Sequence, residues 1–402
     1  MDVNVARQPI FNQQKELAGY ELLFREDEVI GQMVVDGDSK TSSVISNSYF
    51  SIGLEKLLGG KRGYINFIKN LLIEKFPLLL PRQSIVVEIL EDIDVDDDLI
   101  EACQELCDSG YTLALDDFVF SPELLPLVTM AKIIKFDFLI STPEEIRQYL
   151  AMLPADSERT LLAEKIETNE QFDLAKGMGF QLFQGFFFCR PEIIKGAVIP
   201  DVSLKLLQVV AEVNQKDFNI DKLEELIEPD ISITYKLLRY INSAYYALET
   251  RISSIKQAIT YLGQNEIRRF VSMVALSNLS EGKPDEIARS ACCRAKFCEL
   301  VAAVSPVNVS EREAFTAGLL SLVDAIIGQP MKVIMEALPL SNGIKDALVS
   351  GAGHTGLILK LAKFYERGCW DDISKITHEL DIDESLLPGF YFQSCQWSNS
   401  IS

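Results

Sequence analysis

The first half of this chain alternates between short β-rich segments and helix-like stretches, and this alternation limits the folds that it can adopt. Eight β-rich segments occur within about the first 190 residues. They are Val3–Ile10, Gly19–Phe24, Gly63–Phe67, Ser84–Leu90, Thr112–Leu115, Ile133–Phe136, Thr160–Ala163 and Phe180–Phe188. Strands that alternate with helices predict a parallel sheet with crossover connections. Eight of them predict a closed (β/α)8 barrel of the TIM type.

We expect a modified barrel, because the first two strands lie too close in the sequence for a helix between them. Only the short link NQQKEL separates them, and such a link is typical of a hairpin. One strand of the barrel should therefore run antiparallel to its neighbours. A doubly wound open sheet is the alternative fold, but its strands would have to share a ligand crevice at one switch point.

The alternation stops near Arg190–Asp201, where two prolines and a glycine indicate a linker. From Val202 onward the apolar residues recur at helical spacing, and Gly263 follows one such stretch as a C-cap candidate. We therefore expect two domains, an α/β barrel over residues 1–195 and an all-α domain over residues 196–402.

Charge and composition exclude several classes of function. A net charge of -21 and a pI near 4.6 argue against a nucleic-acid binder and against docking on an anionic membrane. No apolar run approaches the roughly 18–20 residues that span a bilayer. The first residues lack the features of a signal peptide, so we expect a cytoplasmic protein. Eight cysteines without a CxxC pair, and only two histidines, make a zinc site improbable.

Acidic residues stand at or near the ends of several apolar segments. They are Glu21, Glu88, Asp116, Asp117, Glu164 and Glu167. A buried carboxylate is costly unless a positive charge meets it. Because the reactive groups of such barrels sit at the carboxyl ends of the strands, these side chains should share one hard divalent cation site.

The same residues carry a resemblance to the EAL domain, a family that hydrolyses or binds cyclic di-GMP. The matches follow one another in order through about 190 residues. They are QPIFN in the first strand, Gly19–Arg25 for GxEALxR, Asn66 in the third strand, Glu88 in the fourth, Asp116–Phe118 for DDF, Lys135 and Asp137 for KID, Ala163–Thr168 for AEGVET, and Gln184–Phe186 with Pro191 for QGYxFxxP.

The resemblance assigns a role to each matched residue. It implies Mg2+ or Mn2+ held by Glu21, Asn66, Glu88, Asp116 and Asp117. It makes Glu164 the base or water-orienting residue, with Lys135 and Glu167 beside it. It implies contacts with the dinucleotide from Gln8, Arg25 and Gln184. Two cations would supply an activated water and relieve charge on the phosphoryl oxygens.

One departure from the family lies in the loop after Asp117. Active EAL domains usually continue DDF with the glycine-rich GTGYSS, whereas this chain continues with VFSPEL. Pro122 removes the flexibility that the glycines would give. The departure favours a receptor or regulatory module, which is the function that we expect from the sequence. The complete polar set favours the alternative, a metal-dependent phosphodiesterase that gives pGpG.

The second half resembles the HDOD domain, a helical relative of HD phosphohydrolases that lacks their catalytic residues. The resemblance is carried by Pro229–Gly263 and by Glu266–Arg269. With only His354 and His378, this half cannot supply the clustered His and Asp ligands of HD enzymes. The order of the two domains resembles the EAL–HDOD signalling family. It implies cyclic di-GMP as ligand and a signalling protein as partner of the HDOD domain, and it leaves a homodimer open.

Overall fold

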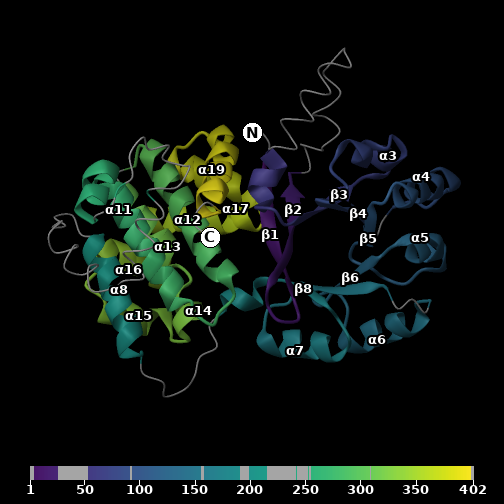
Figure 1. Ribbon diagram of the computed structural model, residues 1–402, viewed down its shortest axis with the longest axis horizontal. Coiled ribbons are helices and arrows are strands. Elements are labelled where there is room, and N and C mark those ends of the chain that lie inside the picture. Colours follow the sequence, from purple (N-terminus) through teal and green to yellow (C-terminus); the bar gives the residue numbers. More distant parts are fainter. Residues whose placement is uncertain are drawn as a thin grey trace, which may run out of the picture. The chain divides into compact units, whose positions relative to one another are not determined.

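The computed structural model of the protein describes residues 4–25, 53–90, 93–154, 158–190, 199–214, 241, 252, 255–307 and 309–399. The chain forms two compact units, each described by itself below (Figure 1). The first unit comprises Met1–Arg190, Phe364–Ile373 and Ser385–Gln396. The second comprises Pro191–Lys363, Ser374–Glu384 and Trp397–Ser402. Most of Pro229–Gly263, which carries the HDOD resemblance, lies outside the described residues.

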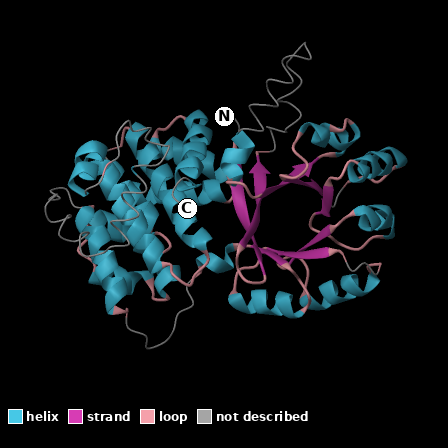
Figure 2. Ribbon diagram, in the orientation of Figure 1, coloured by secondary structure: helices cyan, strands magenta, loops and turns pink. Residues whose placement is uncertain are grey.

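Eight strands form a closed barrel in the first unit, as the alternation of the sequence predicts (Figure 2). The strands are β1 (Val5–Asn12), β2 (Leu17–Phe24), β3 (Arg62–Phe67), β4 (Ile85–Ile89), β5 (Thr112–Leu115), β6 (Ile133–Asp137), β7 (Thr160–Glu164) and β8 (Leu182–Gln184). Each strand pairs with the next in the sequence, and β8 pairs with β1 to close the ring.

The barrel departs from a fully parallel one at β1, which confirms the predicted hairpin. Strand β1 runs antiparallel to both β2 and β8, while the other neighbours are parallel. The side chain of Asn12 closes the turn by accepting the N–H groups of Gln14 and Glu16, both at 2.9 Å. Lys15, in the turn where the chain reverses direction, has a positive φ of 61°.

Helices cover the outside of the ring (Figure 2). They include α3 (Lys69–Ile73), α4 (Asp97–Asp108), α5 (Leu125–Met130), α6 (Pro143–Met152) and α7 (Asn169–Gly177). Thr142 and Thr168 begin α6 and α7 with capping boxes, each a hydroxyl bonded to the third helical N–H. Of another helix-like stretch of the sequence, Thr41–Leu58, residues 41–52 lie outside the described residues.

The last strand is shorter than the sequence predicts. The β-rich run Phe180–Phe188 forms a strand only over Leu182–Gln184, and a 3-10 turn follows at Phe186–Cys189. Gly185 separates the two with φ 143°, a conformation that other residues rarely adopt. A Cβ there would also overlap the backbone of Ile166, so the glycine allows the ends of β7 and β8 to approach closely.

The second unit consists of helices in the part that the structure describes. Those that lie wholly or partly in it are α8 (Asp201–Val213), α11 (Ile255–Leu279), α12 (Asp285–Val304), α13 (Glu311–Leu320), α14 (Val323–Ile327), α15 (Met331–Ala337), α16 (Asn342–Val349), α17 (Gly353–Glu366), α18 (Trp370–Leu380) and α19 (Leu387–Asn399). Within α11, two helices meet at a kink at Gly263, whose φ of 75° and ψ of 166° are not helical, so one helix ends at this glycine as the sequence predicts.

Close backbone packing marks the centre of the second unit. A Cβ on Gly318 of α13 would overlap the backbone of Ala295 in α12, so these two helices approach as only glycine permits.

Across the described residues no single helix is both long and apolar enough to cross a membrane; only the bent pair Glu311–Ile327 and Met331–Ala337 meets that test when joined.

Candidate metal centre

The candidate site lies one layer of side chains above an apolar layer of the barrel interior. The lower layer contains Ile10, Tyr64, Val86, Ala114, Ile133 and Leu162, with Leu182 packed against it. Side chains alternate between the two faces of a strand, so residues two positions further on point the same way. This period places polar residues next on six strands: Asn66, Glu88, Asp116, Lys135, Glu164 and Gln184.

Strands β1 and β2 complete the polar layer. Because β1 runs in the opposite direction, its polar residue is Gln8, two positions before Ile10. Gln8 pairs in register with Glu21 on β2. The layer therefore contains most of the residues that the sequence predicts for the site. The register of the strands brings them together, although they are far apart in the sequence.

Lys135 is the centre of this layer. Its side chain is fully buried, and its Nζ lies 2.7 Å from Glu88, 2.7 Å from Asp116, 2.9 Å from Glu164 and 3.6 Å from Glu21. One ammonium thus faces four carboxylates that come from four other strands or strand ends. If all four are ionised, the cluster has an excess of negative charge, which further positive charge would neutralise.

Burial and ion pairing act in opposite directions on these groups. Burial raises the pKa of Glu88 and of Glu164 well above the usual value, and Lys135 offsets only part of this. Burial also opposes the charge of Lys135, but Glu164 and the other carboxylates outweigh it and raise its pKa well above the usual range. For Asp116, contact with Lys135 outweighs burial and lowers the pKa.

Several oxygens of the cluster have no hydrogen-bond partner among the described residues. They are Asn66 Oδ1, both carboxylate oxygens of Glu88, Asp117 Oδ1 and Gln184 Oε1. The 2.7 Å approach of Lys135 to Glu88 is a close ion pair, yet its angles do not make a hydrogen bond. Buried polar atoms are normally paired. Oxygen atoms of this kind, converging from several strands, are the ligands that hard divalent cations prefer.

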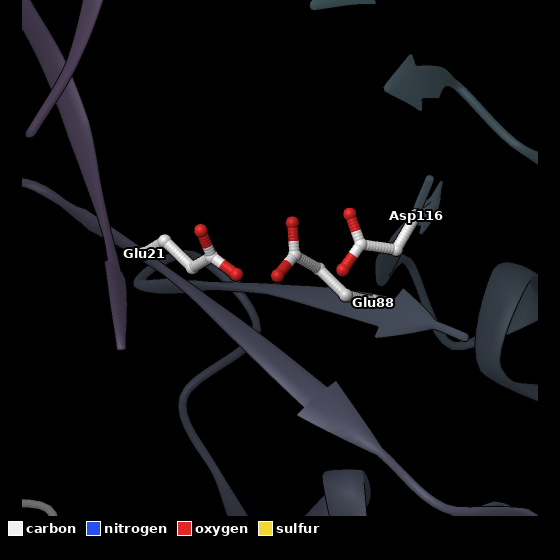
Figure 3. A group of neighbouring side chains, drawn as sticks. All are labelled: Glu21, Glu88 and Asp116. Atoms are coloured by element: carbon white, nitrogen blue, oxygen red, sulfur yellow. The ribbon is translucent and has the colours of Figure 1, made fainter. Parts of the chain in front are cut away.

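The carboxylates form two overlapping groups with the spacing of metal ligands. Glu21, Glu88 and Asp116 make an inner triad, whose carboxylates face one another from three strands (Figure 3). Asp116, Asp117 and Glu164 make an outer triad. In each triad the ligand atoms lie within 4.8 Å of one another, and Asp116 belongs to both. The geometry suits two neighbouring cations that share one carboxylate.

Amide side chains hold Glu21 in the inner triad. Asn66 Nδ2 donates to Glu21 at 3.3 Å, and Gln184 Nε2 also donates to Glu21. The same Gln184 nitrogen donates to Gln8 at 3.0 Å, so β1, β2 and β8 are linked through one amide. These contacts orient the carboxylate of Glu21 toward the cluster.

A second lysine lies beside the outer triad, and the motifs of the sequence do not predict it. Lys165 follows β7 with φ 53° and pairs its Nζ with Asp137 and, at 3.5 Å, with Asp117. Burial opposes its charge, but Asp137 and Asp117 outweigh this and raise the pKa of Lys165. The one available signal was the lysine in AEKIET, where the family motif has glycine.

Glu167 lies apart from the cluster, and Arg25 stands one residue after β2. Glu167 points to the surface, where its carboxylate lies 2.6 Å from Arg190, and its N–H donates to Gln171 at the start of α7. Arg25 follows β2, and its backbone N–H donates to the carbonyl of Asn4 at 3.3 Å. The structure therefore brings Gln8, Lys135, Gln184 and the five predicted metal ligands together with Glu164, but not Glu167.

The loop after Asp117 is held by its own residues and by contacts with β6. Asp117 has φ 38°, and its N–H donates to the carboxylate of Asp116 at 3.1 Å. Phe118 is buried against Phe136, and Pro122 begins a 3-10 turn. The proline thus fixes a local turn at the point where glycines were expected in an active family member.

The helical unit offers no comparable site in its described part. His354 and His378 are both exposed there, and no group of three His, Cys, Asp or Glu side chains has metal-ligand spacing in that part. The expectation that this half lacks HD-type metal ligands rests on the residue types, and the described geometry adds no cluster.

Comparison with protein families identifies two domains. The model of the EAL domain matches residues 48–191, and the model of the HDOD domain matches residues 197–331. The EAL match begins after β2, so it includes most of the polar layer but not Gln8, Glu21 or Arg25.

Two full-length relatives cover those first strands as well. The cyclic di-GMP phosphodiesterase CdgJ of Vibrio cholerae is 36% identical over 400 residues, which is 99% of this chain and 93% of CdgJ. The uncharacterized protein YuxH of Bacillus subtilis is 36% identical over 409 residues, with 100% and 99% of the two chains covered.

Among solved structures, the similarity is lower. BlrP1 of Klebsiella pneumoniae, in complex with calcium and cyclic di-GMP, is 21% identical over 48% of this chain and 56% of its own, with a TM-score of 0.37. YkuI of Bacillus subtilis, which has an EAL domain, is 18% identical over 66% and 72% of the two chains, with a TM-score of 0.36.

Proposed function

Because the chain belongs to the two-domain EAL–HDOD family, we propose that it is a cation-dependent phosphodiesterase that hydrolyses cyclic di-GMP to linear pGpG. The observation that carries the proposal is the pair of triads that share Asp116 on one rim of the barrel. The name of CdgJ, which aligns with nearly the whole chain, supports the same activity.

The oxygen ligands fit Mg2+ or Mn2+. Two such cations would relieve charge on the phosphoryl oxygens and activate the attacking water. Glu21, Glu88 and Asp116 would hold the first with Asn66, and Asp116 and Asp117 would hold the second, with Glu164 beside it. The oxygens of Glu88, Asn66 and Asp117 that accept no hydrogen bond are the atoms left for this purpose among the described residues.

The remaining residues of the layer would position and move protons. Glu164 would accept the proton of the attacking water, because a carboxylate whose pKa is raised by burial is a stronger base. Lys135 keeps its charge and holds Glu164 at 2.9 Å. We assign contacts with the dinucleotide to Gln8 and Gln184 within the layer and to Arg25 beyond it.

A receptor without turnover is the second candidate. The rigid turn at Pro122 and the pairing of Asp117 with Lys165 favour it, since both restrain the outer triad. In that case the barrel would bind cyclic di-GMP, and the HDOD domain would pass the signal on through contacts with a protein partner.

One assay separates the two candidates. Purified protein is incubated with cyclic di-GMP and Mg2+ or Mn2+, and the products are followed by chromatography. We expect pGpG from the wild type and none from Glu21→Ala. Glu16→Ala is the matched control, because Glu16 lies on the same hairpin but is exposed, and its carboxylate accepts a hydrogen bond from Asn12 at 2.8 Å.

Each other outcome has a defined meaning. If no product forms but calorimetry detects binding that Arg25→Ala weakens, the protein is a receptor and the phosphodiesterase proposal is wrong. If Glu21→Ala turns over as fast as the wild type, the inner triad does not act in catalysis.

A further inference from the structure

Lys165 places a positive charge beside one triad and not beside the other. Its Nζ lies 3.5 Å from Oδ2 of Asp117 and pairs with Oδ2 of Asp137. Asp117 belongs only to the outer triad. The inner triad contacts Lys135, which also contacts the outer triad through Asp116 and Glu164.

Asp137 anchors Lys165 in this position. The side chain of Asp137 is 3% exposed, and its second oxygen accepts the N–H groups of Leu139 at 2.6 Å and Ile140 at 3.1 Å. A carboxylate fixed in this way keeps its direction, so the ammonium that pairs with it stays near Asp117. The lysine is 47% exposed and can leave without opening the barrel core.

The backbone at Lys165 is unfavourable for a lysine. Its φ of 53° lies in the left-handed region, which glycine adopts more readily. Asp117 also has a positive φ, of 38°. Two neighbouring non-glycine residues in this region indicate that the pairing between them is held by the surrounding structure.

We propose that Lys165 is a tethered cation that competes with a divalent ion for Asp117, so that it lowers the affinity of the outer triad and not of the inner one. This inference rests on the function proposed above, because that function assigns Asp117 to a cation. An ammonium next to a ligand repels a second positive charge, and it must be displaced before the carboxylate can turn fully toward the ion. Lys165 is thus a positioning residue, acting through Asp117.

Binding of Mn2+ alone tests the proposal without any nucleotide. Free Mn2+ is counted by electron paramagnetic resonance during titration of the full chain. We expect one tighter and one weaker site in the wild type. Lys165→Met should tighten the weaker site by about tenfold and leave the tighter one within about twofold. Lys165→Gly, which suits the positive φ, should do the same and covers the case in which the methionine variant folds poorly.

Two further variants isolate the charge. Lys165→Arg keeps the charge and should behave as the wild type. Lys176→Met removes the same charge from the last turn of α7, where the ammonium donates to the carbonyl of Gln13 and lies 6.0 Å from the ring centroid of Phe172, and it should leave both sites unchanged. If Lys165→Arg also tightens the weaker site, loss of the lysine side chain rather than loss of its charge is responsible, and the proposal is wrong.

Failure of this inference differs from failure of the proposed function. If Mn2+ binds two sites, and each site has the same affinity in the wild type, in Lys165→Met and in Lys165→Gly, then Lys165 does not have the proposed role. The cation-dependent function would still stand. An absence of Mn2+ binding in every variant at millimolar concentration overturns both.

Discussion

Two lysines of the barrel rim perform similar chemistry in different surroundings. Lys135, on β6, is fully buried and contacts four carboxylates. Lys165, just after β7, is 47% exposed and contacts two aspartates. One site can therefore contain two kinds of ion pair: pairs that hold the site together, and pairs whose ammonium can be exchanged for another cation.

Solvent explains the difference. Removing one partner of a buried pair leaves an uncompensated charge in a medium that solvates it poorly. An ion pair that reaches water contributes little to stability, because water replaces the lost partner and salt screens it. We therefore expect Lys135 to stabilise the structure of the site, and Lys165 to adjust the affinity of the outer triad for a cation.

Lys135→Met should have the largest effect on the barrel. Loss of the buried ammonium leaves the carboxylates facing one another, and we expect the barrel to lose about 3–5 kcal/mol in cation-free buffer. Hydrogen exchange of the β4 to β7 peptides measures this local stability without assuming that both units unfold together. Mn2+ should restore more protection to this variant than it adds to the wild type. Exchange equal to that of the wild type would contradict a scaffold role.

Glu88→Gln should have the next largest effect, on cation binding rather than on the fold. Glu88 is fully buried, and the amide offers one oxygen in place of a carboxylate. We expect the tighter Mn2+ site to weaken by at least about tenfold, the lower end of what even outer-shell changes cause. Glu167→Gln is the matched control, because that carboxylate pairs with Arg190 at the surface. If Glu88→Gln and Glu167→Gln lose Mn2+ affinity equally, the buried glutamate is no more important for cation binding than the surface one, and the prediction is wrong.

The fold was predictable because strand and helix periods differ along the chain. The antiparallel start followed from the short link before Leu17, and the barrel followed from the alternation. The details that failed depend on single backbone angles. Gly185 ends β8 early, and Lys75, with φ 59°, divides one helix-like stretch of the sequence, Lys69–Leu79, into α3 and a 3-10 turn at Phe76–Leu79. Neither angle has a periodic signal.

The site was predictable to the extent that strand register defines it. Glu88 and Glu164 lie together because parallel strands bring equivalent positions to one layer. Glu167 stands only three residues after Glu164, but the chain has left the strand there and begins to cap α7. Lys165 reaches Asp117 and Asp137 through tertiary contacts, since these residues are 48 and 28 positions away in the sequence.

Lys165→Met should have the smallest effect on stability and the clearest dependence on salt. Because its ammonium is half exposed, we expect a change of no more than about 1 kcal/mol in the local stability of the barrel. The tightening of the outer triad for Mn2+ in this variant should shrink when the salt concentration rises from 0.05 M to 0.5 M, since screening weakens the competing charge in the wild type. Lys135→Met, by contrast, should keep its loss of protection at both salt concentrations, because its charges are enclosed. Hydrogen exchange and Mn2+ titration at the two salt concentrations measure both lysines side by side. If the change in Mn2+ affinity caused by Lys165→Met is the same at both salt concentrations, the charge of Lys165 is enclosed like that of Lys135. The distinction between the two lysines would then be wrong.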